Sequence, residues 1–250
     1  MTLLNYYNKE TKILTIPPEF NEELKDIPEE TEKIIFYEYM EISTSKFNKS
    51  VDNLPKSLTH LTFGGSFNQP VDNLPKKLIY LTFGLLFNKP VDNLPKKLTH
   101  LTFGWNFDKK IDNLPKNLTH LTFGYCFNQS VDNLPKNLTH LTFGLTFNQS
   151  LEKLPENLIY LKIGLSFQNK IIIPKNCKTL GLTYKNKIIN NLPEHIETLF
   201  ITKFYVNNYI DNLPVSIKEI VIDSEYNKKL LKNIPFGTLI TVNENCINHF

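Results

Sequence analysis

A unit of twenty residues repeats along most of the chain, and this repeat limits the possible fold more than any other feature. Residues 51–70 have the sequence VDNLPKSLTHLTFGGSFNQP, which recurs with few changes at 71–90, 91–110, 111–130 and 131–150, and more loosely at 151–170. The proline of the Leu-Pro pair marks each unit from Pro55 to Pro155, and the spacing continues with small changes to Pro235. Repeats of this length predict a solenoid in which each unit packs against its two neighbours.

Within each unit, the alternation of apolar and polar residues predicts one short β-strand. Leu61-Thr62-Phe63 has the period of a strand with one buried face. Because so short a strand is not stable alone, it must pair in parallel with its equivalents in the next units, about 4.8 Å away. The unit has no room for a full α-helix, so the return side around Leu54-Pro55 is expected to be extended or 3₁₀. We therefore predict a mainly β, leucine-rich-repeat-like solenoid of about ten 20-residue coils with a parallel sheet on one face.

The chain is expected to form a single solenoid domain over residues 1–250. Residues 1–50 are interpreted as an N-terminal cap and an irregular first coil, which carries the Leu-Pro-like pair Ile27-Pro28. Residues 51–170 are six regular repeats. Residues 171–250 are divergent coils and a C-terminal cap, because the repeat decays there and solenoid ends differ from the interior.

Stacking of the coils should place equivalent side chains in columns. Phe63 and Phe67 would begin two buried aromatic columns that supply much of the core. The glycine that follows each strand, beginning at Gly64, either adopts a positive φ or lies where a side chain would clash. Asn68 and its equivalents, with Asp108 and Gln168 in register, are expected to form a ladder that satisfies backbone groups in the turns.

These motifs resemble a known family of repeats. Residues 54–75 combine Leu-Pro, Leu-x-x-Leu-x-Phe-Gly and Phe-Asn at fixed offsets, and this combination is similar to the FNIP repeat. FNIP repeats are relatives of leucine-rich repeats that are abundant in social amoebae and in giant viruses that infect amoebae. The resemblance is strong over 51–170 and weaker over 27–50 and 171–240, and it implies a solenoid used for protein interaction. Some members carry an F-box that recruits a ubiquitin ligase, but residues 1–50 lack a helical F-box pattern.

One column of the predicted sheet is rich in imidazole and phenol rings. The residue before each strand leucine forms the column His60, Tyr80, His100, His120, His140 and Tyr160. Histidines in consecutive coils could bind a transition metal, although no carboxylate or thiolate shares the column. The same row could instead contact a protein partner, or be a plain exposed surface. The sequence leaves these three interpretations open.

The residue after each repeat glycine varies most among the copies. Gly65, Leu85, Trp105, Tyr125, Leu145 and Leu165 occupy this position. Variation on a fixed framework suits a recognition surface, and tryptophan and tyrosine are frequent interface anchors. Strict alternation from Phe63 would instead turn the position inward, so its direction stays open. We select His60, Tyr80, His100, Trp105, His120, Tyr125, His140 and Tyr160 as candidate partner-binding residues.

Several other classes of function are disfavoured. The net charge of +3 is small for 250 residues, and no arginine is present, so neither nucleic acid nor a membrane is expected as a partner. No catalytic, phosphate-binding or metal-binding motif occurs, so we expect no enzyme and no cofactor. The first residues lack an apolar signal, and Cys126, Cys177 and Cys246 are odd in number and widely spaced. A protein of the cytoplasm, or of the host cytoplasm if the source is viral, is therefore expected.

Overall fold

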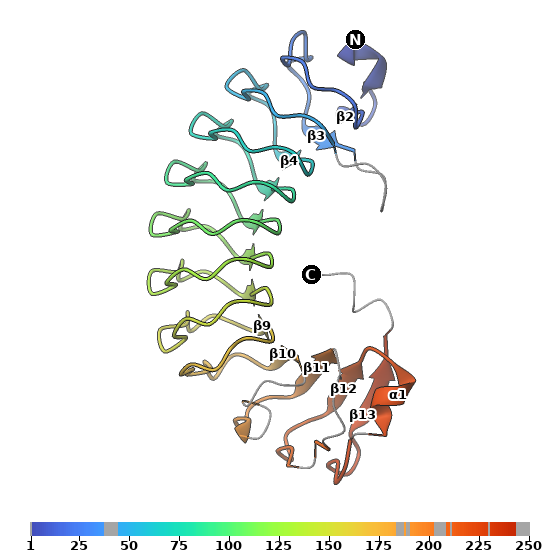
Figure 1. Cartoon of the computed structure of the whole chain (residues 1–250), viewed down its shortest axis with the longest axis vertical. Helices are drawn as coiled ribbons and strands as arrows, with labels where there is room; N and C mark the ends of the chain where they lie inside the picture. The colour runs from blue at the N-terminus through green and yellow to red at the C-terminus, as the bar shows by residue number, and fades with distance from the viewer. Residues whose placement is uncertain are drawn as a thin grey trace.

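The computed structural model describes residues 2–37, 45–183, 188, 191–202, 209–210, 212–229 and 231–243. The chain forms an arc of stacked coils, with the strands on the inner side and the turns on the outer side (Figure 1). All the strands form one thirteen-stranded sheet in which neighbours in sequence are neighbours in space. The prediction of a mainly β, leucine-rich-repeat-like solenoid with a parallel sheet on one face is confirmed.

The parallel part of the sheet runs without interruption from β2 to β13. Each pair joins equivalent residues of two coils, as His100↔His120, Leu101↔Leu121 and Thr102↔Thr122 do. The strands of the regular repeats are β4 (His60–Thr62), β5 (Tyr80–Thr82), β6 (His100–Thr102), β7 (His120–Thr122), β8 (His140–Thr142) and β9 (Tyr160–Ile163). Those that flank them are β2 (Ile13–Ile16), β3 (Lys33–Phe36), β10 (Thr179–Thr183), β11 (Thr198–Thr202), β12 (Glu219–Ile222) and β13 (Leu239–Val242).

The segments for which the sequence predicts caps also contribute strands to the sheet. Pairing in parallel already begins between β2 and β3, and it continues to β13 within the divergent C-terminal part. At the N-terminal edge, β1 (Tyr7–Asn8) pairs antiparallel with β2 and follows the 3₁₀ helix η1 (Leu3–Tyr6). A single α-helical turn, α1 (Glu225–Lys228), follows β12. No helix in the described ranges is long and apolar enough to cross a membrane.

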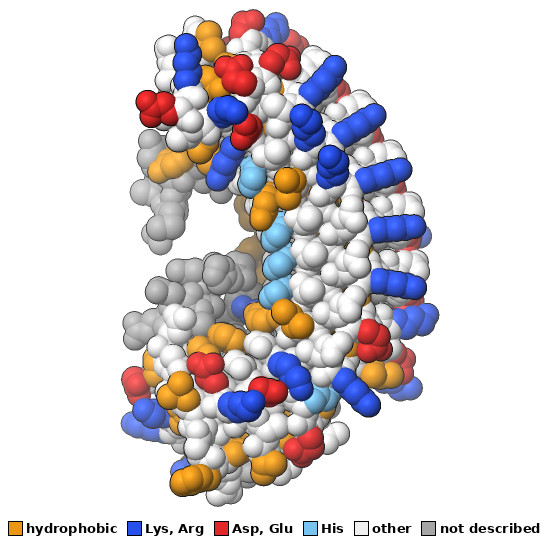
Figure 2. Space-filling model, turned by 180° about the vertical axis from the view of Figure 1, so that it is seen from behind, with side chains coloured by type: hydrophobic (Ala, Val, Ile, Leu, Met, Phe, Trp, Pro, Cys, Tyr) orange, Lys and Arg blue, Asp and Glu red, His pale blue; other side chains and the backbone are white. Residues whose placement is uncertain are grey.

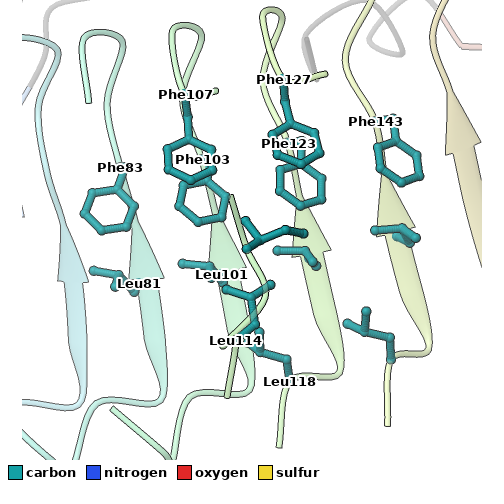
Figure 3. Packing of buried hydrophobic residues seen from close by; sticks show 14 of the residues in the cluster. Leu81, Phe83, Leu101, Phe103, Phe107, Leu114, Leu118, Phe123, Phe127 and Phe143 are labelled. Atoms are coloured by element: carbon teal, nitrogen blue, oxygen red, sulfur yellow. The ribbon is translucent and has the colours of Figure 1, made fainter. Parts of the chain in front are cut away.

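Two phenylalanine columns form the centre of the core, as predicted (Figure 3). Phe103 stacks on Phe123 with 5.6 Å between ring centroids, and Phe107 stacks on Phe127 at 6.1 Å. Within one coil, the rings of Phe103 and Phe107 are only 3.7 Å apart, which joins the two columns. All of these rings are buried, and each contributes on the order of 1.5–3 kcal/mol. Leucines such as Leu101 complete the core beneath the strands (Figure 3).

The repeat glycines are required by close packing between coils. The backbone φ is positive at Gly237 alone among the described glycines, so the first of the two explanations offered by the sequence is wrong for this series. A Cβ at Gly124 would collide with the carbonyl group of Gly104, and the same holds for Gly144 against Gly124. The second explanation, a side-chain clash, is therefore confirmed.

A ladder of amide side chains ties the turns together, as the sequence predicts. The Oδ1 atom of Asn68 accepts a hydrogen bond from the backbone N–H of Asn88 at 2.9 Å, and Asn88 does the same for Asp108 at 3.0 Å. Asp108 and Asn148 continue the pattern toward Asn128 and Gln168. Each side chain thus satisfies one backbone donor of the following coil, which fixes the spacing of the coils.

Candidate functional site

The inner face of the arc presents the columns that the sequence analysis selected. In β7, Leu121 is buried in the core, whereas His120 and Thr122 lie on the opposite face and are half-buried. Because the neighbouring strands are in register, the same alternation gives a row of rings and a row of threonines. Histidine side chains gather along the inner side of the arc, whereas many lysines lie on its outer side (Figure 2).

The rings of the candidate column are stacked face to face over six coils. The centroids of His100 and His120 are 4.2 Å apart, as are those of His120 and His140. Tyr80 lies 4.4 Å from His60 and 4.2 Å from His100, and His140 is followed by Tyr160 at 5.8 Å. The structure therefore brings all six residues of this column together in one uncharged row.

A threonine beside each histidine determines which ring nitrogen carries hydrogen. The hydroxyl of Thr139 lies 2.9 Å from Nδ1 of His140 and donates its one hydrogen to the carbonyl of Thr119, at 3.1 Å. Thr119 makes the same pair of contacts with His120 and Thr99. Because that hydrogen is already used, Nδ1 must be the donor toward the threonine oxygen. In the neutral ring, this hydrogen-bond network therefore places the hydrogen on Nδ1 and leaves the free lone pair on Nε2.

The stack also keeps the imidazoles neutral. Burial is the main cause that lowers the pKa of His120 to about 4, and the neighbouring charges of His140 and His100 contribute to the same shift. Burial is likewise the main cause that lowers the pKa of His60, His100 and His140. At neutral pH this face therefore offers hydrogen-bond acceptors and ring edges rather than positive charge.

The residue after each repeat glycine points away from the core, which answers the question that the sequence left open. Trp105 is 44% exposed and Leu85 is 42% exposed, and Tyr125 is half-buried. The rings of Trp105 and Tyr125 stack with 4.4 Å between centroids and 1° between planes. Backbone hydrogen bonds hold this row in place, because the carbonyl of Trp105 accepts from the N–H of Cys126 at 2.9 Å.

A groove of about 690 Å³ runs along the inner face beside these residues. Thr102, Thr122 and Thr142 of the threonine row line it, together with the outward residues after the glycines, which are Leu85, Trp105, Tyr125 and Leu145. At the end toward β11 it is lined by Tyr160, Lys162, Phe200 and Thr202. The groove thus contains three of the eight candidate residues, Trp105, Tyr125 and Tyr160, and the histidine row lies at the opposite ends of the same strands.

Sequence reasoning missed Lys162, Phe200 and Thr202 as members of this surface. The only available signal was that Lys162 stands at the position that threonine occupies in the five preceding repeats. Phe200 and Thr202 lie in a divergent coil, where the repeat no longer indicates which residues are equivalent. The pairing of β11 with β10 establishes the equivalence, because it sets Phe200 opposite Gly181 and, through it, level with Lys162.

The metal-binding interpretation of the histidine row finds no geometric support. The rings lie parallel, so their Nε2 lone pairs run side by side and do not converge on one point. Within the described part of the chain, no group of three or more histidine, cysteine, aspartate or glutamate side chains could hold a metal ion. Of the cysteines, Cys177 is buried and Cys126 is partly buried, and both are free thiols, whereas Cys246 lies outside the described residues.

Equivalent aspartates of the repeats form an acidic column, and four of them accept hydrogen bonds from asparagine side chains: Asp52, Asp72, Asp92 and Asp112. Asp52 accepts a hydrogen bond from the side chain of Asn73 at 2.9 Å, and Asp72 accepts one from Asn93 at the same distance. These contacts link consecutive coils, so the column contributes to coil register. The acidic column is therefore explained by its structural role.

Comparison with known proteins identifies the repeats. The family model of the FNIP Repeat matches residues 47–86, 87–126, 110–146 and 127–166. The crystal structure of CroV588, a circular leucine-rich-repeat protein from a giant virus, is similar with a TM-score of 0.67 and 31% identity. The match covers 94% of this chain and 44% of CroV588, so the chain spans less than half of that protein.

A second solved structure and the curated proteins add little. YopM from Yersinia enterocolitica WA-314 matches with a TM-score of 0.31 and 16% identity, over 76% of this chain and 65% of YopM. No curated protein sequence gives a significant match. The solenoid, its coil length and the matched residues agree in assigning the repeats. The chain is therefore an FNIP repeat-containing protein, with the matched repeats at residues 47–166 of a leucine-rich-repeat-like solenoid.

Proposed function

We propose that this chain is a protein-interaction module that binds a protein partner through the inner face of its arc, as an adaptor or a scaffold for host interaction. The observation that carries the proposal is the groove beside Trp105 and Tyr125, where the exposed Trp105 and the half-buried Tyr125 stand at a variable position of the repeated framework. Leucine-rich-repeat-like folds commonly serve as protein-interaction scaffolds. Extended concave surfaces of solenoids suit this use because they present many aligned side chains to one partner.

The chemistry of the inner face supports binding rather than catalysis. A catalytic site needs unlike groups that converge in one cleft, whereas this face repeats like groups along a row. Trp105 and Tyr125 are held by their stacking, so they lose little conformational freedom when a partner covers them. The neutral histidine row adds hydrogen-bond acceptors with no charge to desolvate.

We further propose that the protein acts in the cytoplasm, in a host cell if its source is viral. The support is that Cys126 and Cys177 are free thiols, the state that a reducing compartment maintains. Fractionation of cells that express the tagged full chain tests this directly. Recovery of the protein in the secretory or the nuclear fraction would contradict it.

Affinity purification with quantitative mass spectrometry tests the interaction. The tagged chain is incubated with amoebal lysate beside an inner-face variant that carries His100→Thr, Trp105→Ser, His120→Thr and Tyr125→Ser. We expect at least one protein to be recovered with the native chain and lost with the variant. Equal recovery by both chains would refute binding through the inner face.

A matched control distinguishes binding through the inner face from nonspecific binding to the solenoid. Lys96 and Lys116 are exposed on the outer side of the same coils, and their replacement by glutamine leaves the inner face intact. A partner that binds as proposed is retained by this outer-side variant. Loss of the partner from both variants would indicate a charge-driven association with the whole solenoid. Recovery of no partner at all favours a structural repeat protein without a dedicated ligand.

A further inference from the structure

The residues after the repeat glycines form an apolar, partly aromatic row beside the groove. Trp105 is 44% exposed, and its ring stacks on that of Tyr125 with 1° between the planes. Leu85 and Leu145 continue the row by one coil on each side, and all four residues line the groove. A segment that lies along the groove can therefore pack against several consecutive coils.

The groove favours an uncharged ligand. None of the described residues that line it carries a carboxylate, and Lys162 is the one lysine among them. Lys162 is 7% exposed and already has an interaction within the folded chain. A charged group of a ligand would therefore lose its hydration on entry without gaining an opposite charge.

The polar side chains of the lining offer hydroxyl donors. Thr102, Thr122 and Thr142 stand one coil apart and are half-buried, and their hydroxyls form no hydrogen bond with any described residue. At the end toward β11, Thr202 is 4% exposed, and its hydroxyl is buried without a hydrogen-bond partner. A buried hydroxyl without a partner costs free energy that a ligand can recover by supplying an acceptor. A ligand rich in acceptors therefore suits this groove.

Backbone conformation distinguishes the kinds of protein segment that can supply such acceptors. The carbonyl groups of an α-helix are already bonded within the helix, and an extended strand alternates its carbonyl groups with N–H donors. A polyproline II segment has no internal hydrogen bonds, so its carbonyl groups stay available, and each proline lacks an N–H. Because this backbone is preformed, it loses little entropy when it binds in an aromatic groove.

The spacing of the coils matches the repeat of a polyproline II helix. Equivalent residues two coils apart, such as Trp105 and Leu145, are separated by about 9.6 Å at about 4.8 Å per coil. Polyproline II rises about 3.1 Å per residue with three residues per turn, so residues i and i+3 lie on one face about 9.3 Å apart. Residues on one face of an extended strand are about 6.6 Å apart, which agrees with neither one coil nor two.

We infer that the groove binds a proline-rich segment in the polyproline II conformation, with prolines at positions i and i+3. The prolines pack along the row from Leu85 to Leu145, and the carbonyl groups of the segment accept hydrogen bonds from the threonine hydroxyls. The inference rests on the proposed function and specifies the partner segment of the same surface. A sugar polymer also stacks on aromatic rings, but its many hydroxyl donors call for carboxylate or amide acceptors, which the described lining side chains do not include.

Trp105 is the only tryptophan of the chain, so its fluorescence reports directly on the groove. The full chain is titrated with an oligoproline of about ten residues, which at about 3.1 Å per residue is longer than the row of four coils. We expect a saturable shift of the emission to shorter wavelength as prolines cover the indole. A glycine-serine peptide of the same length, which is flexible and uncharged, should leave the emission unchanged. An emission that oligoproline does not alter would overturn the inference.

Substitutions then test the two kinds of contact, with fluorescein-labelled oligoproline and binding measured by anisotropy. Trp105→Ser should weaken binding by about tenfold or more. Thr122→Val keeps the shape of the side chain and removes the hydroxyl, so it should weaken binding by about three- to tenfold. The outer-side variant Lys116→Gln should bind as the native chain does, and thermal denaturation checks that each variant is folded. Unchanged affinity with both inner-face substitutions would place the peptide elsewhere and overturn the inference.

The spacing of prolines tests the match to the coils. Three peptides of equal length and composition carry a pair of prolines at i and i+2, at i and i+3 or at i and i+4. We expect the i, i+3 peptide to bind most tightly, because its prolines keep step with every second coil. Equal affinity of the three peptides would contradict this register.

Failure of the inference can be told apart from failure of the proposed function. A protein partner that the inner-face variant loses, but whose recovery oligoproline does not reduce, would overturn the inference and leave the proposed function in place. Equal recovery of all partners by the native chain and the inner-face variant would overturn the proposed function, whatever oligoproline does. An emission shift with maltoheptaose but not with oligoproline would assign the groove to glycans and overturn the inference.

Discussion

The carbonyl group of Gly104 occupies the space that a Cβ of Gly124 would need. The same relation joins each pair of consecutive repeat glycines from Gly64 to Gly164. The glycine column is therefore the place where the backbones of neighbouring coils come closest. Its role is steric, since the φ angles of these glycines are not positive.

Replacement of Gly124 by alanine is expected to destabilise the solenoid. The added methyl group meets backbone that cannot move without a shift of a whole coil, so we expect a cost of about 1–3 kcal/mol. Gly181→Ala is the matched control, because its methyl group meets the side chain of Lys162 rather than a carbonyl group. Thermal denaturation followed by circular dichroism compares the two. Equal losses of stability would contradict the steric explanation.

The amide ladder predicts different outcomes for two substitutions of Asn68. Asn68→Ala removes the acceptor for the N–H of Asn88 and should cost about 1–2 kcal/mol. Asn68→Asp keeps an oxygen acceptor there, as Asp108 does naturally for Asn128, and should retain most of the stability. Urea denaturation measures both. A large loss with aspartate would show that the amide hydrogens, and not the oxygen, stabilise the turn.

The phenylalanine columns predict a large effect of a single truncation. Phe107 is fully buried and lies 3.7 Å from Phe103 and 6.1 Å from Phe127 between ring centroids. Phe107→Ala should therefore cost about 3–5 kcal/mol through lost burial and the cavity that remains. Leu86→Ala, at a position that is 42% exposed, should change the stability by less than about 0.5 kcal/mol. The midpoints of guanidinium denaturation give the comparison.

The stability of the fold should decrease as the pH falls below the ordinary pKa of histidine. The pKa of His120 is lowered from the ordinary value of 6.5 to about 4, so between these values the unfolded chain binds more protons than the folded one. The contribution of this histidine to the free energy of unfolding is therefore complete above pH 6.5 and is lost as the pH falls toward 4. Allowing for the partial exposure of the rings, we expect a loss of about 1–2 kcal/mol for the row, or about 2–8 °C in melting temperature.

A tyrosine variant of the row provides the control for this pH dependence. Tyrosine occurs naturally at Tyr80 and Tyr160 of the same column, so His100→Tyr, His120→Tyr and His140→Tyr preserve the stack. The triple variant should lose clearly less stability than the native chain between pH 6.5 and 4.5, because it no longer takes up these protons. A native chain that melts at the same temperature across this range would disprove the lowered pKa values.

The fold could be predicted from the sequence because the same twenty-residue unit occurs many times. Once the twenty-residue period is recognised, the buried positions of Leu121 and Phe123 follow from alternation, and their columns follow from stacking. The ladder through Asn68 could be predicted for the same reason. The pairing of β2 with β3 was not predicted, although Ile13 and Lys33 are twenty residues apart, because the insertion between Phe36 and Phe47 puts both strands out of step with the period that begins at residue 51.

The candidate site could be predicted only in part. The histidine column was found from the period alone, but the direction of Trp105 depends on how the chain turns after the glycine, and alternation does not extend through a turn. Lys162 was visible as a departure from threonine, yet its burial depends on the glycine opposite it in β10. That contact joins a regular repeat to a divergent one, where the sequence no longer indicates the register.

The identical register of consecutive strands bears on how such a chain can change during evolution. Because the surface that His120 to Phe123 offer to the next coil matches the one that His100 to Phe103 offer, a whole unit can be inserted or deleted in this region without creating a mismatched junction. The length of the inner face can therefore vary by unequal recombination while its chemistry is preserved. Point changes after the glycine then diversify the new unit without any adjustment of the core.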